Sequence, residues 1–190
     1  MSAETNQPVA ERVENPVKRL FMTLTEGVYV IGAASDGKRD AFTASSVMQV
    51  SLQPPMVAVA VNPENASFAL LRDSGAFAIT VLQSYQIPMA GFFGANSGRE
   101  EDKLAQVQWH MSPGGAPVLD EGMSFFDCRV VATHPVGDHV LVVATVAGGD
   151  FLQPRSRPLR YDELEDLDGS GELMPSRLEN PVSEIHQQRR

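Results

Sequence analysis

AFTASSVMQVSLQPPMVAVAVNP, residues 41–63, joins a strand-like pattern to a concentration of hydroxyl side chains. The stretch contains no charged residue, and four hydroxyls precede its proline pair: Thr43, Ser45, Ser46 and Ser51. Hydroxyls and backbone N–H groups offer a neutral ligand several hydrogen bonds at modest desolvation cost, whereas a charged wall needs a charged partner. The stretch therefore predicts the wall of a pocket for a planar, uncharged heteroaromatic ring rich in hydrogen-bond acceptors.

The residues on either side of the hydroxyl cluster predict a sheet. Pro54 and Pro55 cannot donate ladder hydrogen bonds, so the sheet must break or reach an edge there before residues 56–61 resume as an apolar strand. Residues 28–34 predict a buried strand, and residues 35–38 a hairpin turn after it. The hydroxyl cluster is therefore expected on the return strand of this hairpin.

Short helices interrupt the strands along the rest of the chain. Ser67 is expected to cap a helix that reaches about Asp73, with Gly75 just beyond its end. Other helical patterns start at Asn15-Pro16 or cover 86–93 and 102–107, and further strands are expected at 76–82, 124–133 and 140–146. Six strands with two or three short helices predict a mainly β fold, a closed antiparallel barrel rather than alternating βαβ units.

Length and composition are those of one domain with extensions. With 190 residues, 43% hydrophobic and 21% charged, the chain fits the prior of roughly one domain per 100–200 residues. We divide it into a flexible N-terminal extension at 1–14, a domain at 15–161 and an acidic C-terminal extension at 162–190. The last of these is expected to be solvated or to pack on a partner, because six acidic and no basic residues lie within 162–172.

Charge and cysteine count argue against several classes of protein. The formal net charge of -9 disfavours binding to nucleic acid or to an anionic membrane, because phosphates attract clustered Lys and Arg. Cys128 is the only cysteine, so no internal disulfide is expected, and no spacing typical of a metal site occurs. The N-terminus lacks the apolar core of a secretory signal. We therefore expect a cytoplasmic protein without a metal, whose partners are small molecules or proteins.

Four segments of the chain together resemble a known family. They are GVYVIGAASDGKRDAFTASSVMQVSLQPPMVAVAVN at 27–62, SFALLRDSGAFAITVL at 67–82, FFGANSG at 92–98 with Asp102-Lys103 downstream, and Gly137-Asp138-His139. Over roughly residues 15–161 the chain resembles the flavin reductase-like, FMN-binding split-barrel family. The resemblance implies a homodimeric, six-stranded antiparallel split β-barrel with short flanking helices, which binds FMN or FAD near the dimer interface. Many members reduce the flavin with NADH or NADPH.

The resemblance also implies roles for individual residues. Thr43, Ala44, Ser45 and Ser46 match the lining of the isoalloxazine, the flavin's three-ring system. Asn62 and Ser67 match the approach to the ribityl chain or phosphate, with Arg99 and Lys103 as cationic partners. Phe93 and Gly94 belong to the loop over the flavin, where the family usually has Phe-Ser-Gly, so Phe93 replaces a polar contact with a stacking one. His139 matches a histidine near the nicotinamide, where it is expected to orient a ring rather than to transfer a proton.

Each of these residues also has a simpler structural explanation. Serine and threonine hydroxyls at strand ends often satisfy backbone groups, and Ser67 can act only as a helix cap. Arg99 and Lys103 can be ordinary surface charges, and His139 can cap its own turn. A helix N-terminus at Ser67 is nevertheless compatible with phosphate binding, because its free N–H groups attract an anion.

The sequence thus predicts an NAD(P)H-dependent flavin reductase that passes a hydride to flavin N5. FMN is the first choice of flavin and FAD the second, and the reduced flavin is expected to serve a monooxygenase or another acceptor such as ferric iron. Two alternatives stay open: an electron-transfer protein with tightly bound FMN that no nicotinamide reduces, and a flavin-binding regulatory module without turnover. The choice between NADH and NADPH, the acceptor and the role of the tail also stay open.

Overall fold

The computed structural model of this protein describes residues 15–164 and 174–178. Its contacts divide the chain into two compact units, Thr25–Asp168 and a smaller one made of Met1–Leu24 with Gly169–Arg190. The predicted N-terminal extension and most of the predicted acidic extension lie outside the described residues. The boundaries of the predicted domain at 15–161 stay a prediction.

The smaller unit contains the helix α1 (Pro16–Phe21), which begins where the sequence predicts. The Asn15 side chain accepts hydrogen bonds from the backbone N–H groups of Val17 at 2.8 Å and Lys18 at 3.2 Å. Pro16 occupies the first turn, where the missing N–H has no helical partner to lose. The Asn15 amide also donates to the Met174 carbonyl at 3.0 Å, which ties the two ends of this unit together.

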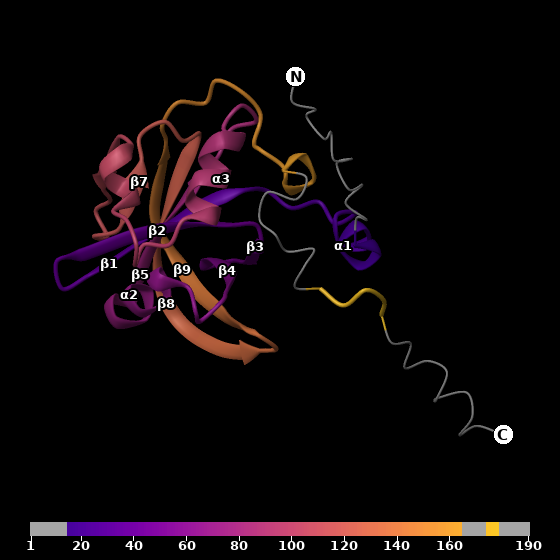
Figure 1. The fold of residues 1–190 in the computed structure, drawn as a ribbon. Helices are drawn as coiled ribbons and strands as arrows, with labels where there is room; N and C mark the ends of the chain where they lie inside the picture. The colour runs from indigo at the N-terminus through magenta and orange to yellow at the C-terminus, as the bar shows by residue number, and fades with distance from the viewer. Residues whose placement is uncertain (1–14, 165–173, 179–190) are drawn as a thin grey trace, which may run out of the picture. The chain divides into compact units, whose positions relative to one another are not determined.

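In the larger unit, the described residues form one sheet of seven antiparallel strands (Figure 1), in the order β2-β1-β5-β8-β9-β4-β3. The strands are β1 (Tyr29–Ser35), β2 (Lys38–Ala44), β3 (Val47–Leu52), β4 (Pro55–Val61), β5 (Ala76–Val81), β8 (Ser124–Val136) and β9 (His139–Phe151). A second, two-stranded sheet pairs β6 (Trp109–Met111) with β7 (Pro117–Leu119). The prediction of a mainly β, antiparallel fold is confirmed.

The predicted count of six strands is wrong for this sheet. The predicted return strand is two strands, because the chain leaves β1 after Ala44 and joins β4 from Val47 onward. The Ser45 carbonyl accepts from Val47 N at 2.7 Å and the Ser46 carbonyl from Ala60 N at 3.0 Å, which fixes this crossing. β2 and β3 are therefore the two edge strands of the sheet. Within the described residues they do not pair with each other, so the sheet is not a closed barrel.

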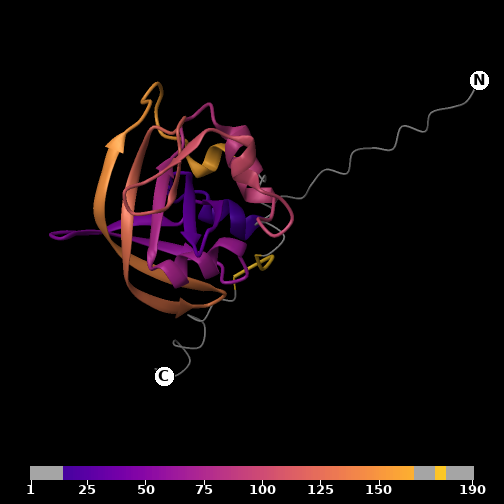
Figure 2. The same cartoon turned by 90° about the vertical axis from the view of Figure 1, so that its left-hand side faces the viewer.

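The predicted turns agree with the structure in their positions. In the β1–β2 hairpin Asp36 and Gly37 both have positive φ angles, 50° and 75°, as a type I′ turn requires. Gln53 and Pro54 form the turn between β3 and β4, with Pro55 as the first residue of β4. β8 and β9 are 13 residues each and bend along the sheet (Figure 2), with register shifts after Asp127 and Val130.

Helices cover the ends of this sheet. α2 (Ala66–Ser74) contacts β1 and β2, and α3 (Ile87–Ala95) contacts β2. Short 3-10 helices follow at η1 (Lys103–Gln106) and η2 (Tyr161–Glu163). The α2 cap is Asn65 rather than Ser67, because the Asn65 side chain accepts from Ser67 N at 2.9 Å, while Gly75 ends the helix with φ of 63° as predicted. No helix among the described residues is long and apolar enough to cross a membrane.

Candidate functional site

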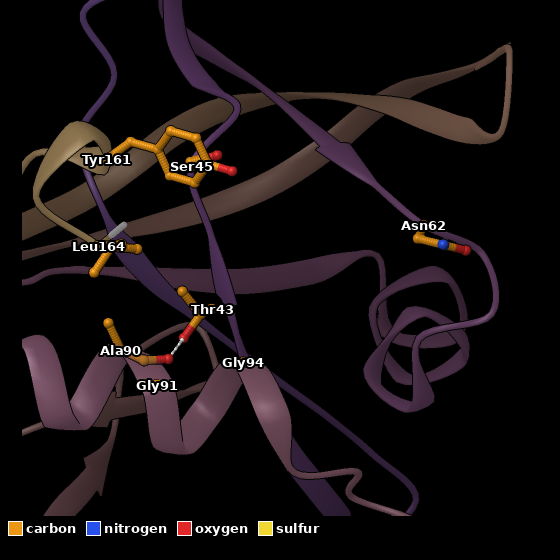
Figure 3. A pocket seen from close by; sticks show the side chains of 8 residues that line it. All are labelled: Thr43, Ser45, Asn62, Ala90, Gly91, Gly94, Tyr161 and Leu164. Carbon is orange, nitrogen blue, oxygen red and sulfur yellow. Dashed lines mark hydrogen bonds between the residues drawn. The ribbon is translucent and has the colours of Figure 1, made fainter. Parts of the chain in front are cut away.

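A pocket of about 280 Å³ opens where β2 ends, inside the larger unit (Figure 3). Its volume is near the lower end of the roughly 300–1,000 Å³ typical of small-molecule sites. The lining residues come from β2, α3 and η2 and from the positions that directly follow β2, β4 and η2: Thr43, Ser45, Asn62, Ala90, Gly91, Gly94, Tyr161 and Leu164. Among these described residues none carries a charge at neutral pH.

The β2 side of the pocket follows from strand alternation. Thr43 and Ser45 point to one face and line the pocket, whereas Ala44 between them packs into the core of the sheet. Thr43 Oγ1 donates to the Ala90 carbonyl at 2.7 Å, a bond that joins β2 to α3. The hydroxyl is thereby held in one orientation, and its lone pairs stay available to a second partner.

The α3 side of the pocket is made of backbone as much as side chain. Gly91 and Gly94 lie three residues apart on this helix, and neighbours at this spacing share a face. A Cβ at Gly91 would meet no described atom within 4 Å, and one at Gly94 would lie 3.7 Å from Thr43 Cβ. The two glycines leave a narrow part of the pocket beside α3, called the slot below, free of side chains. A flat ligand can therefore approach the helix backbone closely.

Asn62 lines the pocket just after β4 and is exposed. Its Oδ1 accepts from Glu64 N at 2.9 Å, and its carbonyl accepts from Asn65 N at 3.0 Å. Both bonds shape the turn from β4 into the helix, and the first orients the Asn62 side chain.

Ser67 and Lys103 lie outside the pocket, in a buried polar cluster with Asp40. Ser67 Oγ donates to Asp40 Oδ2 at 2.6 Å, and Lys103 Nζ lies 3.4 Å from Asp40 Oδ1. Lys103 Nζ also donates to the Asn96 carbonyl at 3.0 Å. The side chains of Lys103 and Asp40 are only 2% and 8% exposed, so each charge depends on the other for compensation. Contact of Ser67 or Lys103 with a flavin phosphate stays a prediction, and this geometry favours a structural role.

Comparison with known proteins places this chain in a family. The profile of the family described as "Flavin reductase like domain" matches residues 21–165, about three quarters of the chain. The chain belongs to the flavin reductase-like family. It is 32% identical over 160 residues to "FMN reductase (NADH) RutF" of Methylorubrum extorquens, with 81% of this chain and 78% of that protein aligned.

Two further relatives of this flavin reductase-like chain carry different names. It is 32% identical over 142 residues to "High molecular weight rubredoxin" of Moorella thermoacetica, and the match covers 73% of this chain and only 61% of that protein. The crystal structure of a nitrilotriacetate monooxygenase component B homologue from Mycobacterium thermoresistibile superposes with a TM-score of 0.71 at 30% identity. That superposition covers 78% of this chain and 82% of the other.

Four other residues suggested by the family resemblance lie apart from the pocket lining. Ser46 and Arg99 are exposed, and Phe93 is buried with its ring edge-on to Phe92 at 5.2 Å between centroids. His139 begins β9 at the tip of the β8–β9 hairpin, where Nδ1 lies 2.8 Å from Asp138 Oδ1. That hydrogen bond lowers the pKa of the exposed Asp138 carboxyl. The structure thus brings together Thr43, Ser45, Asn62 and Gly94 in one pocket, and the roles of all the candidate residues stay predictions.

The pocket of this flavin reductase-like domain also contains residues that the sequence did not single out: Ala90, Gly91, Tyr161 and Leu164. The sequence offered a signal for Gly91 and Gly94, because glycine disfavours a helix and two glycines in a short apolar helix therefore call for a structural explanation. Cys128 is no candidate nucleophile, because burial, with Asp127 adding to it, raises the pKa of its thiol to about 12. Among residues 15–164 and 174–178, no cluster of three or more His, Cys, Asp or Glu could hold a metal ion.

Proposed function

We propose that this protein is a flavin reductase that promotes hydride transfer from NADH or NADPH to FMN held in the pocket at the end of β2. The observation that carries the proposal is the neutral lining of hydroxyl, amide and backbone groups in a chain of the flavin reductase-like family. A charged group of a ligand would find no opposite charge in this pocket wall to offset its burial, whereas a neutral heteroaromatic ring needs none.

The lining residues have distinct roles in this proposal. The flavin, when bound, supplies the redox chemistry through its ring nitrogen N5. Ser45 donates or accepts a hydrogen bond at the ring edge, and Thr43, held by Ala90, offers an acceptor in a fixed orientation. Gly91 and Gly94 let the ring approach the α3 backbone. The protein's contribution is therefore positioning, which is the main requirement of hydride transfer between two rings.

FMN and NADH are the preferred pair, because the relative at 32% identity is named an NADH-dependent FMN reductase. FAD and NADPH are the alternatives. We propose that the reduced flavin serves a partner monooxygenase, because the similar crystal structure is that of a homologue of a monooxygenase component. We also assign the fold to the split-barrel class and the protein to the cytoplasm, a location with which its single, buried thiol is compatible.

We propose a homodimer as the working form. Large apolar side chains stand exposed on β3, β8 and β9: Met48, Leu52, Phe126 and Phe151. β3 is an edge strand, and its residues Val47 and Met48 line a cavity of about 280 Å³. A second cavity of about 500 Å³ shares Phe126 and Val146 with the first. An apolar patch next to an open strand edge is typical of a surface that a partner covers.

The decisive experiment is anaerobic mixing of the purified protein with FMN and then NADH or NADPH, followed by the visible absorbance of oxidised flavin. Protein-dependent bleaching by either nucleotide is the expected result. Retained flavin colour with both nucleotides would contradict the reductase assignment. It would favour an electron-transfer flavoprotein, a second candidate that the rubredoxin-named relative supports.

A further inference from the structure

Tyr161 is an aromatic residue of the pocket to which nothing above assigns a role. It begins η2, and with Leu164 it lines the pocket from the C-terminal end of the larger unit. Ala90, Gly91 and Gly94 line the same pocket from α3 (Figure 3). One wall is therefore helix backbone with little side chain, and another is an aromatic ring.

The backbone that carries Tyr161 is held along its length by hydrogen bonds. Tyr161 N donates to the Glu26 carbonyl at 2.9 Å. Just before it, Leu159 N donates to the Leu82 carbonyl at 2.9 Å and the Leu159 carbonyl accepts from Val28 N at 2.9 Å. The Leu159 side chain is fully buried. The Cα of Tyr161 is thereby fixed against the sheet, so its ring reaches the pocket from a rigid base.

The turn of η2 separates charged from apolar side chains. Arg157 pairs with Glu163 and Arg160 pairs with Asp162, all four at the surface. The hydrogen bond from Arg157 lowers the pKa of Glu163 to about 2, so this carboxylate stays ionised near neutral pH. Leu164 is buried on the other side of the turn. The ion pairs thus close the turn from the solvent side and leave Tyr161 and Leu164 to the pocket.

We propose that Tyr161 is a flavin-binding residue that packs its ring against the isoalloxazine and makes the slot selective for planar ligands. The inference deepens the proposed function and rests on it. A phenol ring is neutral at physiological pH and offers a flat, polarisable surface, the property that aromatic side chains use to hold heteroaromatic bases. A Cβ at Gly91 would meet no described atom within 4 Å, so the α3 wall leaves open space beside the helix backbone for a planar ring system.

The test compares the full-length wild type with Tyr161→Ala, Tyr161→Phe and Tyr161→Leu by FMN titration. Aromatic stacking on a heteroaromatic base is worth about 1–3 kcal/mol. Tyr161→Ala should therefore raise the FMN Kd roughly 5- to 150-fold by that measure. Tyr161→Phe keeps the ring and should stay within about threefold, while Tyr161→Leu should fall between. The quenching of bound-flavin fluorescence should weaken in the same order, a signature that a merely structural residue would not change.

Tyr85→Ala is the matched control, because Tyr85 is exposed and lies outside the pocket lining. Its FMN Kd should equal that of the wild type. Equal affinity and equal quenching in wild type and folded Tyr161→Ala would overturn the inference while leaving the proposed function intact. If Tyr161→Ala does not fold, the same equality in Tyr161→Leu would overturn it. Failure of the wild type itself to bind FMN would overturn the proposed function.

Discussion

Ser45 and Ser46 are adjacent serines that the structure separates by role. Ser45 lines the pocket, and Ser46 is exposed beside it with its carbonyl bonded to Ala60 N. Ser45→Ala should weaken FMN binding by about 1–3 kcal/mol, because the polar edge of the ligand then loses its partner. Ser46→Ala should change it by less than about 0.5 kcal/mol. Calorimetric titration of both variants checks this, and equal losses would remove the assignment of Ser45.

Gly91 offers a prediction in which stability and binding move in opposite directions. Glycine inside a helix destabilises it by about 0.5–1 kcal/mol relative to alanine, and a Cβ at this position meets no described atom within 4 Å. Gly91→Ala should therefore raise the free energy of unfolding by about that amount. Its methyl group should also narrow the slot and weaken FMN binding. Urea unfolding and flavin titration test the two effects, and a more stable variant with unchanged affinity would contradict close approach of the ring to α3.

Among the elements, the end of α3 and η1 are held to β2 by one buried charge. Lys103 reaches both Asp40 and the Asn96 carbonyl, and Asp40 also accepts from Ser67 in α2. Gly98 is part of this arrangement, because a Cβ there would collide with the Asp40 carboxylate. The cluster therefore joins four elements around the segment that carries Gly94.

Removal of Lys103 from its buried ion pair with Asp40 should strongly destabilise the protein. Lys103→Met leaves Asp40 buried without its cation and should lower the free energy of unfolding by about 3–5 kcal/mol. Asp102→Asn is the control, because the Arg39–Asp102 pair is exposed and should contribute less than about 1 kcal/mol. Urea unfolding curves compare them. A Lys103→Met variant no less stable than Asp102→Asn would refute the importance of the cluster, and the double variant with Asp40→Asn should recover part of the loss.

Elements with a local signal could be predicted from the sequence, and contacts between distant residues could not. The Asp36-Gly37 turn and the Gly75 helix end follow from positive φ angles that those residues tolerate. The uncharged, hydroxyl-rich stretch at 41–63 predicted a pocket wall, and of its hydroxyls Thr43 and Ser45 line the pocket whereas Ser46 and Ser51 do not. Asp40, in contrast, sits in a charged run typical of an exposed turn, and its burial depends on distant partners, Ser67 and Lys103.

The same limit applies to the pocket and to the strand count. Tyr161 reads in the sequence as the last residue before an acidic tail, and its place in the pocket depends on pairing with residues near Glu26. Ser45 and Ser46 look like strand residues, yet the chain uses them to pass from β1 to β4. The residue pattern of one strand predicts which side chains point to which face of the sheet. Which strand pairs with it depends on contacts throughout the sheet.

At the scale of the whole molecule, the apolar patch on β3, β8 and β9 gives the last prediction. Leu52 and Phe151 are 82% and 73% exposed. Exposed apolar patches are typical of surfaces that bind a partner, whereas single exposed apolar residues are common. If two copies bury this patch, Leu52→Lys places an unpaired charge in their interface and should convert the dimer to a monomer. Met111→Lys is the control, because Met111 is exposed on β6, outside the patch.

Light scattering coupled to size exclusion measures the mass of each variant directly. The wild type and Met111→Lys should elute with twice the chain mass of 20.6 kDa, and Leu52→Lys with the mass of one chain. In a monomeric protein Leu52→Lys costs little, because an exposed leucine contributes little to folding. Its unfolding midpoint should therefore fall only through loss of the dimer and should become independent of protein concentration, unlike that of the wild type. A wild type that elutes as a single chain would refute the homodimer, and a dimeric Leu52→Lys variant would move the interface to another face.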